Sequence, residues 1–186
     1  MIKKTTLLCL SLCFIIFTAC SNDDGSSTPN DQNGEVSLSQ LSNGEGALAS
    51  TGAINLDWQG NAYWELTSTS LTSNGVSYYV WEVIMDGPTD AEYIRIQIVE
   101  EESSVSNDMP SNGIYTLGGS MDENDIQIYT NEGDYFFSLT SNGEFELTKN
   151  GDVLEITLQA TDLESGGIGE DETFIDVNLA LKALKD

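Results

Sequence analysis

Tyr93-Ile94-Arg95-Ile96-Gln97-Ile98 decides the fold class, because apolar and polar side chains alternate along it without a break. In an extended chain, successive side chains point to opposite faces, so the three isoleucines share one face and the polar groups the other. This is the pattern of a half-buried β-strand. Residues 153–160 repeat it, and we expect their inward face to carry Leu154, Ile156, Leu158 and Ala160.

Two further features extend the β prediction. In the stretch 76–85, apolar side chains occur at odd-numbered and at even-numbered positions, so both faces of the strand would be apolar. This indicates a central strand covered on both sides. Asn142-Gly143 and Asn150-Gly151 each stand between alternating runs, and Asn-Gly tolerates the positive φ angles of tight hairpin turns. These turns predict a meander of strands near residues 134–141, 144–149 and 152–161.

The C-terminal segment from Thr173 to Lys182 alternates as well. It predicts a strand that closes the sheet, although residues 180–185 also suit a short helical tail. About nine short strands at this spacing predict an all-β domain, either an antiparallel β-sandwich or a calycin-like β-barrel. The remaining candidate strands cover residues 47–58, 61–69, 114–118 and 125–130.

Residues 1–19 predict a lipoprotein signal peptide. Lys3 and Lys4 form a positive start, and the apolar run 7–17 is too short to span a bilayer. The run ends in Phe17-Thr18-Ala19-Cys20, which resembles the lipobox of bacterial lipoproteins, where cleavage precedes a lipid-modified cysteine. The resemblance implies that Cys20 is the lipidated first residue of the mature chain. An ordinary cleaved signal is the alternative.

Residues 20–34 predict a flexible acidic tether, because they contain no apolar side chain large enough to pack. Its start, Cys20-Ser21-Asn22-Asp23-Asp24, resembles the acidic export signal of lipoproteins in Bacteroides-type bacteria. The resemblance implies anchoring in the outer membrane with the domain facing the cell exterior. The alternative is a solvated linker on a protein that faces the periplasm. Residues 35–186 then form a single β domain.

The charge is strongly one-sided. There are 31 Asp and Glu against 6 Lys and Arg, the formal net charge is −25, and there is no His. Loss of Lys3 and Lys4 with the signal peptide leaves four cationic side chains and a charge of −27. Nucleic-acid binding is excluded, since it depends on Lys and Arg that neutralise phosphates. The absence of His excludes imidazole bases, Ser-His and Cys-His relays, and His-bound metals.

Two stretches in the second half of the chain resemble a known group. Met109-Pro110-Ser111-Asn112-Gly113-Ile114-Tyr115-Thr116-Leu117 is similar to a Pro-Ser-Gly-Thr-Tyr-Thr step, although Asn112 interrupts it. Residues 143–152 are similar to a Gly-x-Val-x-Ile-Thr-Lys-x-Gly-Asp hairpin. Both of these motifs occur in the small β-rich lipoproteins of Bacteroides-type bacteria, which the chain therefore resembles. The resemblance implies a sandwich or calycin-like barrel on a lipid anchor, and no catalytic residues.

Aromatic side chains are the first candidate ligand-binding groups, because exposed aromatic faces stack on the apolar faces of sugar rings. Trp58 and Trp64, with the neighbouring Tyr63, are the candidates, whereas Trp81 lies in the two-faced apolar stretch and is expected in the core. Packing in the core or at its rim is the alternative for Trp58 and Trp64 as well.

Calcium is the one metal that suits the acidic runs, because hard cations prefer carboxylate and carbonyl oxygens. The candidate ligands do not match a calcium-loop pattern, and solvated acidic turns are the simpler explanation for them. We therefore expect no obligatory cofactor. The candidates are Asp122, Asp125, Glu170 and Asp171.

These observations predict a binding module without enzymatic activity. Paired carboxylates do serve glycosidases, but among 31 acids a suitable pair arises by chance. Capture of a glycan at the cell surface is the first hypothesis for function. Recognition or neutralisation of a basic protein is the alternative, since a charge of −27 attracts cationic partners from a distance.

Overall fold

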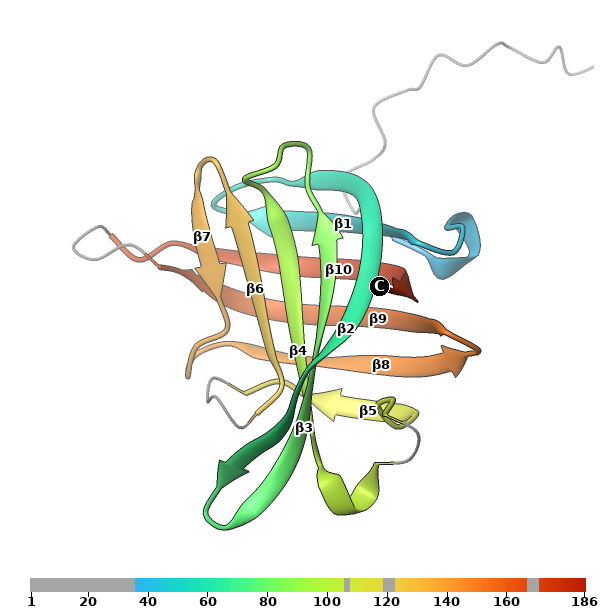
Figure 1. Cartoon of the computed structure of the whole chain (residues 1–186). Coiled ribbons are helices and arrows are strands. Elements are labelled where there is room, and N and C mark those ends of the chain that lie inside the picture. Colours follow the sequence, from blue (N-terminus) through green and yellow to red (C-terminus); the bar gives the residue numbers. More distant parts are fainter. Residues whose placement is uncertain (1–35, 106–107, 119–122, 167–170) are drawn as a thin grey trace, which may run out of the picture. The chain divides into compact units, whose positions relative to one another are not determined.

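The computed structural model describes residues 36–105, 108–118, 123–166 and 171–186, which contain ten β-strands and two short 3-10 helices (Figure 1). The all-β prediction is confirmed. The predicted signal peptide and tether, with Cys20, lie outside the described residues. The helices are η1 (Leu38–Gln40) and η2 (Glu102–Ser104), and the strands are β1 (Glu45–Gly52), β2 (Asp57–Ser73), β3 (Val76–Asp86), β4 (Tyr93–Glu101), β5 (Gly113–Thr116), β6 (Asp125–Thr130), β7 (Gly133–Phe136), β8 (Asn142–Asn150), β9 (Val153–Ser165) and β10 (Phe174–Lys185).

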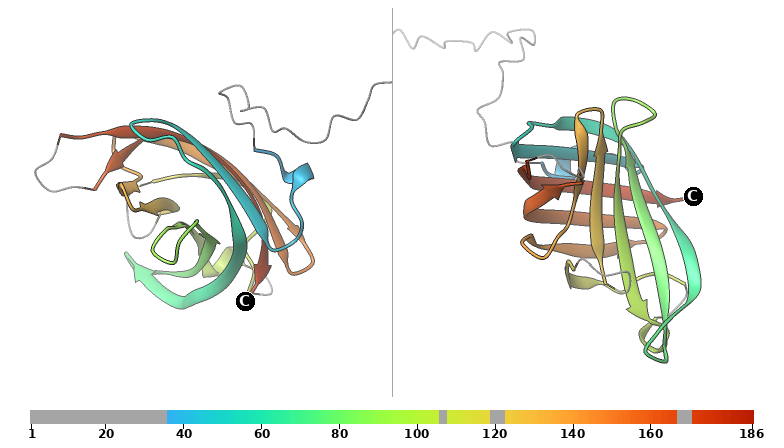
Figure 2. Two further views of the ribbon diagram at one scale, coloured as in Figure 1. Left: turned by 90° about the horizontal axis from the view of Figure 1, so that it is seen from above. Right: turned by 90° about the vertical axis from the view of Figure 1, so that its left-hand side faces the viewer.

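All ten strands belong to one sheet that closes on itself. Its order is β1-β10-β2-β3-β4-β6-β7-β9-β8-β5, with additional β1–β2 and β10–β9 pairings. The β10–β9 pairing closes the strands from β10 to β9 into a ring, and β8 and β5 extend the sheet beyond β9. Figures 1 and 2 show β3, β4, β6 and β7 running steeply across β1, β8, β9 and β10. The result is two facing layers joined at their corners, as in a sandwich closed into a barrel. Among the described residues, neither of the two short helices could serve as a membrane span.

The core lies between the layers and follows the alternation of the sequence. Ile94, Ile96 and Ile98 of β4 are fully buried, and the inward residues predicted for β9 are buried too. Trp64 and Trp81 are also fully buried, and each indole N–H needs an acceptor there. Trp64 Nε1 donates to the Asp152 carbonyl oxygen at 2.9 Å, and Trp81 Nε1 donates to that of Asp108 at 3.1 Å.

The C-terminal prediction is confirmed, because β10 is a strand as far as Lys185 and pairs with β1, β9 and β2. One of the two Asn-Gly predictions is correct: Gly151, with φ of 65°, lies in the turn between β8 and β9. Asn142-Gly143 instead begins β8, where Gly143 packs against Ala160 on β9. The three-strand meander is therefore wrong, because β7 pairs with β6 and β9 and not with β8.

The two stretches that carry the lipoprotein resemblance are neighbours in space. β5 pairs with β8, and the rings of Tyr115 and Phe145 stack with centroids 4.8 Å apart. Asn112, which interrupts the Pro-Ser-Gly step, accepts a hydrogen bond at Oδ1 from the Lys149 backbone N–H at 2.8 Å. The inserted residue thus joins the two stretches, because its side chain satisfies a backbone donor that the short β5 does not reach.

A carboxylate attaches this region to β4. Glu100 accepts hydrogen bonds from the backbone N–H and the hydroxyl of Ser111, at 2.5 and 2.8 Å, and from the Tyr115 hydroxyl at 2.5 Å. Burial, then the hydrogen bond to Glu100 and its negative charge, raise the pKa of Tyr115 far above its usual value. The protonated phenol is therefore the form that the fold stabilises.

Replacing Tyr115 by Phe removes one hydrogen bond to a charged acceptor and is expected to lower the free energy of unfolding by about 1.5 to 3 kcal/mol. Because the folded pKa is raised, the contribution of Tyr115 is complete below its unfolded pKa of about 10 and is lost as the pH rises above it. Chemical denaturation at neutral and alkaline pH measures both effects.

Tyr78→Phe on β3 is the matched control, since Tyr78 is also half-buried. The variant Tyr115→Phe should lose less stability than the wild type between neutral pH and pH values above about 10. If the wild type and Tyr115→Phe lost the same free energy of unfolding at alkaline pH, the assigned role of Tyr115 would be contradicted.

Candidate functional site

The predicted tryptophan platform is not on the surface. Trp58 and Trp64 are 6 % and 0 % exposed, so the prediction that they present a stacking face to solvent is wrong. Both side chains lie on the inward face of β2, whereas Tyr63 lies on its outward face. The signal was in the sequence, because Ala62, Trp64 and Leu66 form an apolar series that alternates with Tyr63, Glu65 and Thr67. Trp81 is in the core, as predicted.

The calcium candidates are not brought together among the described residues. No group of three or more Asp, Glu, His or Cys able to hold a metal occurs there, and Asp122 and Glu170 lie outside them. Asp171 is exposed. Asp125 accepts hydrogen bonds from the Ile126 backbone N–H at 2.8 Å and the Gln127 side chain at 2.9 Å. Burial raises the pKa of Asp125 above its ordinary value.

A different surface collects polar and aromatic side chains: the outer face of β2, β3, β4 and β6. β3 does not have a second layer on this face, because Glu82 and Ile84 are only half-buried, and the predicted two-sided cover is wrong. Strand pairing arranges the outward side chains in rows that cross the sheet. The rows are Glu65-Glu82-Gln97-Asp125, Tyr63-Ile84-Arg95-Gln127 and Asp86-Tyr93-Tyr129.

At one end of these rows the surface is hollowed. We call this the β3–β4 hollow; it measures about 640 Å³ and extends under the connection 87–92. That connection is held by the Gly87 N–H, which donates to the Glu92 carbonyl oxygen at 2.7 Å, and by the Thr89 hydroxyl, which donates to Glu92 Oε2 at 2.9 Å. The side chains that matter for chemistry are Tyr63, Glu82, Ile84, Asp86, Asp90, Glu92, Tyr93 and Arg95.

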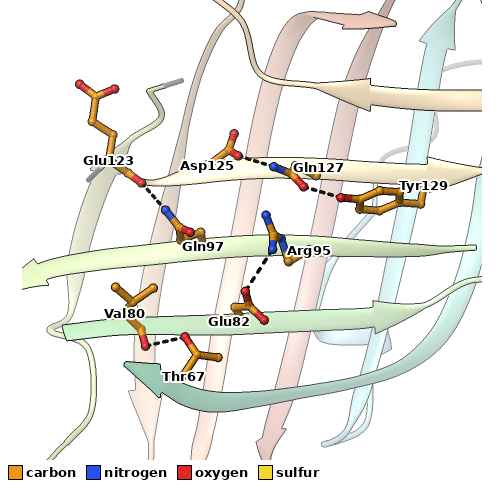
Figure 3. Close-up of polar contacts among 9 residues, drawn as sticks. All are labelled: Thr67, Val80, Glu82, Arg95, Gln97, Glu123, Asp125, Gln127 and Tyr129. Carbon is orange, nitrogen blue, oxygen red and sulfur yellow. Dashed lines mark hydrogen bonds and ion pairs between the residues drawn. The ribbon is translucent and has the colours of Figure 1, made fainter. Parts of the chain in front are cut away.

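Charges in the β3–β4 hollow are mostly negative. Arg95 is the only arginine of the chain, and its Nη1 lies 3.1 Å from Glu82 Oε1 (Figure 3). Three further carboxylates, those of Asp86, Asp90 and Glu92, line the same hollow. An anionic ligand would be repelled there, whereas neutral hydroxyl groups and cations would not.

A series of aromatic rings begins with Tyr93 in the hollow and continues across the outer face to β6 and β7. Tyr93 and Tyr129 stack with centroids 4.4 Å apart, and Phe136 meets Tyr129 edge-on at 5.9 Å. The Tyr129 hydroxyl donates to Gln127 Oε1 at 2.6 Å (Figure 3). Burial, followed by the negative charges of Asp86, Asp186 and Glu65, raises the pKa of Tyr63. Its phenol is therefore protonated at neutral pH and can donate a hydrogen bond to a ligand.

Among the predicted site residues that the structure describes, only Tyr63 lines this hollow. Tyr93, Arg95 and Asp86 were missed as site residues. The sequence did indicate that both Tyr93 and Arg95 face outward, because they alternate with the buried isoleucines of residues 93–98. Their convergence with Tyr63 depends on β2 and β4 flanking β3, which no local pattern indicates.

Comparison of the chain with protein-family models, with curated proteins and with solved structures found no match. The resemblance to Bacteroides-type lipoproteins therefore stays a prediction.

Burial of all three tryptophans has a spectroscopic consequence. The folded protein should show blue-shifted tryptophan emission and weak quenching by the neutral quencher acrylamide, because none of the indoles is more than 6 % exposed. Unfolding in guanidinium should shift the emission to the red and restore quenching. The protein unfolded in guanidinium is the internal reference. Strong acrylamide quenching in the native state would show that Trp58 or Trp64 is exposed and would contradict their assigned burial.

Proposed function

We propose that this protein is a lipid-anchored outer-membrane lipoprotein whose β domain captures a glycan in the β3–β4 hollow. The observation that supports this best is the combination of Tyr63 and Tyr93 with the carboxylate of Asp86 and the guanidinium of Arg95 in one concave surface. A sugar ring has apolar C–H faces and a rim of hydroxyl groups. Aromatic rings suit the former and planar polar side chains suit the latter.

The charge of the hollow narrows the class of glycan. Four carboxylates face one arginine, which Glu82 already pairs. A sulfated or uronic-acid glycan would meet repulsion, so the proposed ligand is a neutral glycan. Carboxylates accept two hydroxyl hydrogen bonds each, which makes them effective partners for neutral sugars.

The anchor and the tether complete this proposal. Lipidation at Cys20 would hold the chain at the membrane, and residues 21–34 would let the domain reach glycans some distance away. Binding without turnover is the proposed activity, so the carboxylates of the hollow serve as hydrogen-bond acceptors and not as an acid–base pair.

Tyr63→Ala and Tyr93→Ala should each weaken binding of a neutral glycan at least about tenfold, because central aromatic residues at binding sites contribute more than about 1.4 kcal/mol. A glycan array that carries neutral and sulfated structures identifies the ligand, and isothermal titration calorimetry measures the affinities. Tyr78→Ala is the matched control, because Tyr78 is half-buried on β3 but does not line the hollow. Unchanged affinity in both Tyr63 and Tyr93 variants would overturn the proposed site.

Recognition of a basic protein is the second candidate, and the excess of carboxylates in the hollow favours it. The two candidates respond differently to salt. Glycan binding should persist at 1 M NaCl, where the screening length is about 3 Å, while binding of a basic protein should collapse. Glu92→Gln should weaken a basic partner more than it weakens a neutral glycan. Lysozyme, as a soluble cationic protein, is a suitable probe.

Surface anchoring is tested on intact cells. The wild-type domain should be accessible to antibody and to added protease, and Cys20→Ala should abolish membrane attachment, because the lipid would be missing. Immunoblots of shaved cells, membranes and medium measure this. A periplasmic protein without a lipid anchor is the control for cell integrity. Protection of the wild-type domain in intact cells would move the proposed location to the periplasmic face.

A further inference from the structure

A second hollow adjoins the first and shares Asn61 with it. This β1–β2 hollow measures about 260 Å³ and is lined by η1 and the facing parts of β1 and β2. Its polar side chains are Gln40, Glu45, Gln59 and Asn61. Amide and carboxylate groups therefore dominate it, and no aromatic ring lines it. It suits hydrogen bonding to hydroxyl groups without stacking.

β2 connects the two hollows. Gln59, Asn61 and Tyr63 alternate with the inward residues, so all three lie at outward parity. At about 3.3 Å per residue, these three positions span about 13 Å along the strand. Gln59 lies in the β1–β2 hollow, Tyr63 lies in the β3–β4 hollow, and Asn61 lies in both.

β2 approaches the end of β3 closely near the residue that the hollows share. A Cβ at Gly60 would collide with the Asp86 carbonyl oxygen, so only glycine permits this close approach of β2 to the end of β3. Beside it, Asn61 Nδ2 donates to Asp86 Oδ2 at 3.3 Å. The two hollows therefore share the Asn61 side chain, which Asp86 holds in place.

The far wall of the β1–β2 hollow is fixed by packing. Leu41, which follows η1, is buried against Ala47 and Ala180 on the outer face of β1 and β10. Ser37 caps η1, and the Glu45 carboxylate accepts a hydrogen bond from the Ser42 N–H at 2.8 Å. Gln40 thus stands on an anchored segment, which favours a preformed site.

We infer that the protein binds an extended stretch of glycan chain, with one sugar stacked in the β3–β4 hollow and neighbouring sugars crossing Asn61 into the β1–β2 hollow. This inference rests on the proposed function and adds the length of the ligand to it. Glycans of every length contact the aromatic side chains of the β3–β4 hollow. Only longer glycans extend into the β1–β2 hollow and form additional hydrogen bonds there.

The test is a length series. Neutral malto-, cello-, laminari- and xylo-oligosaccharides from mono- to hexasaccharide are titrated into the full domain by calorimetry. For the series that binds, affinity should rise with length and then level off. The double variant Gln40→Ala/Gln59→Ala should lose about three- to tenfold in affinity for the hexasaccharide, the effect of one or two neutral hydrogen bonds, and nothing for the shortest binder. Gln159→Ala, on an exposed position of β9, is the matched control.

Three outcomes overturn the inference in distinguishable ways. Equal affinity for mono- and hexasaccharide, with no effect of the double variant, refutes the extended site and leaves the proposed function intact. A length effect that the double variant does not change places the additional sugars elsewhere. If no saccharide of the four series binds while a Lys-rich peptide does, the proposed glycan function fails together with the inference.

Discussion

The closure of the sheet at β10 is the constraint on which the rest of the structure depends. β10 pairs with β1 and β9 along its length, and its last residues reach β2, where Leu184 is opposite Tyr63 and Lys185 is opposite Trp64. Contacts to Trp64 reinforce this corner: its indole donates to the Asp152 carbonyl, the Asp186 N–H donates to its carbonyl, and the Lys185 ammonium lies 5.4 Å from its ring centroid. With β1, which pairs with both β10 and β2, this short contact joins the two layers at one corner of the sheet.

This corner also decides what the domain presents to its surroundings. Because side chains alternate along β2, the register that buries Trp64 places Tyr63 outside. The same register sets Tyr63 beside Ile84, and β3 then brings Arg95 and Tyr93 of β4 within reach of it. The same strand register therefore fixes the residues of the core and those of the candidate site. A change of register on β2 would move both sets of side chains.

The acidity of the chain is compatible with this arrangement because the interior is almost purely apolar. Among the described residues, Ser50 is the one buried polar side chain, and it exchanges hydrogen bonds with the backbone of Ile54 and Leu56. The carboxylates lie outward, where solvent screens their mutual repulsion. The half-buried carboxylate of Glu100 has three hydrogen-bond donors within 2.8 Å.

Local sequence patterns were enough to predict most of the extended stretches and which of their side chains face inward, as Ile94, Ile96 and Ile98 illustrate. Period-two alternation depends only on local backbone geometry, so it can be recognised within six residues. Tertiary structure alone decided that Asn142-Gly143 begins a strand instead of a turn, and that Asn61, Asp86 and Tyr93 meet at one hollow. These outcomes depend on which strands become neighbours and in which register, and that choice arises from pairings between residues as distant as Tyr63 and Leu184.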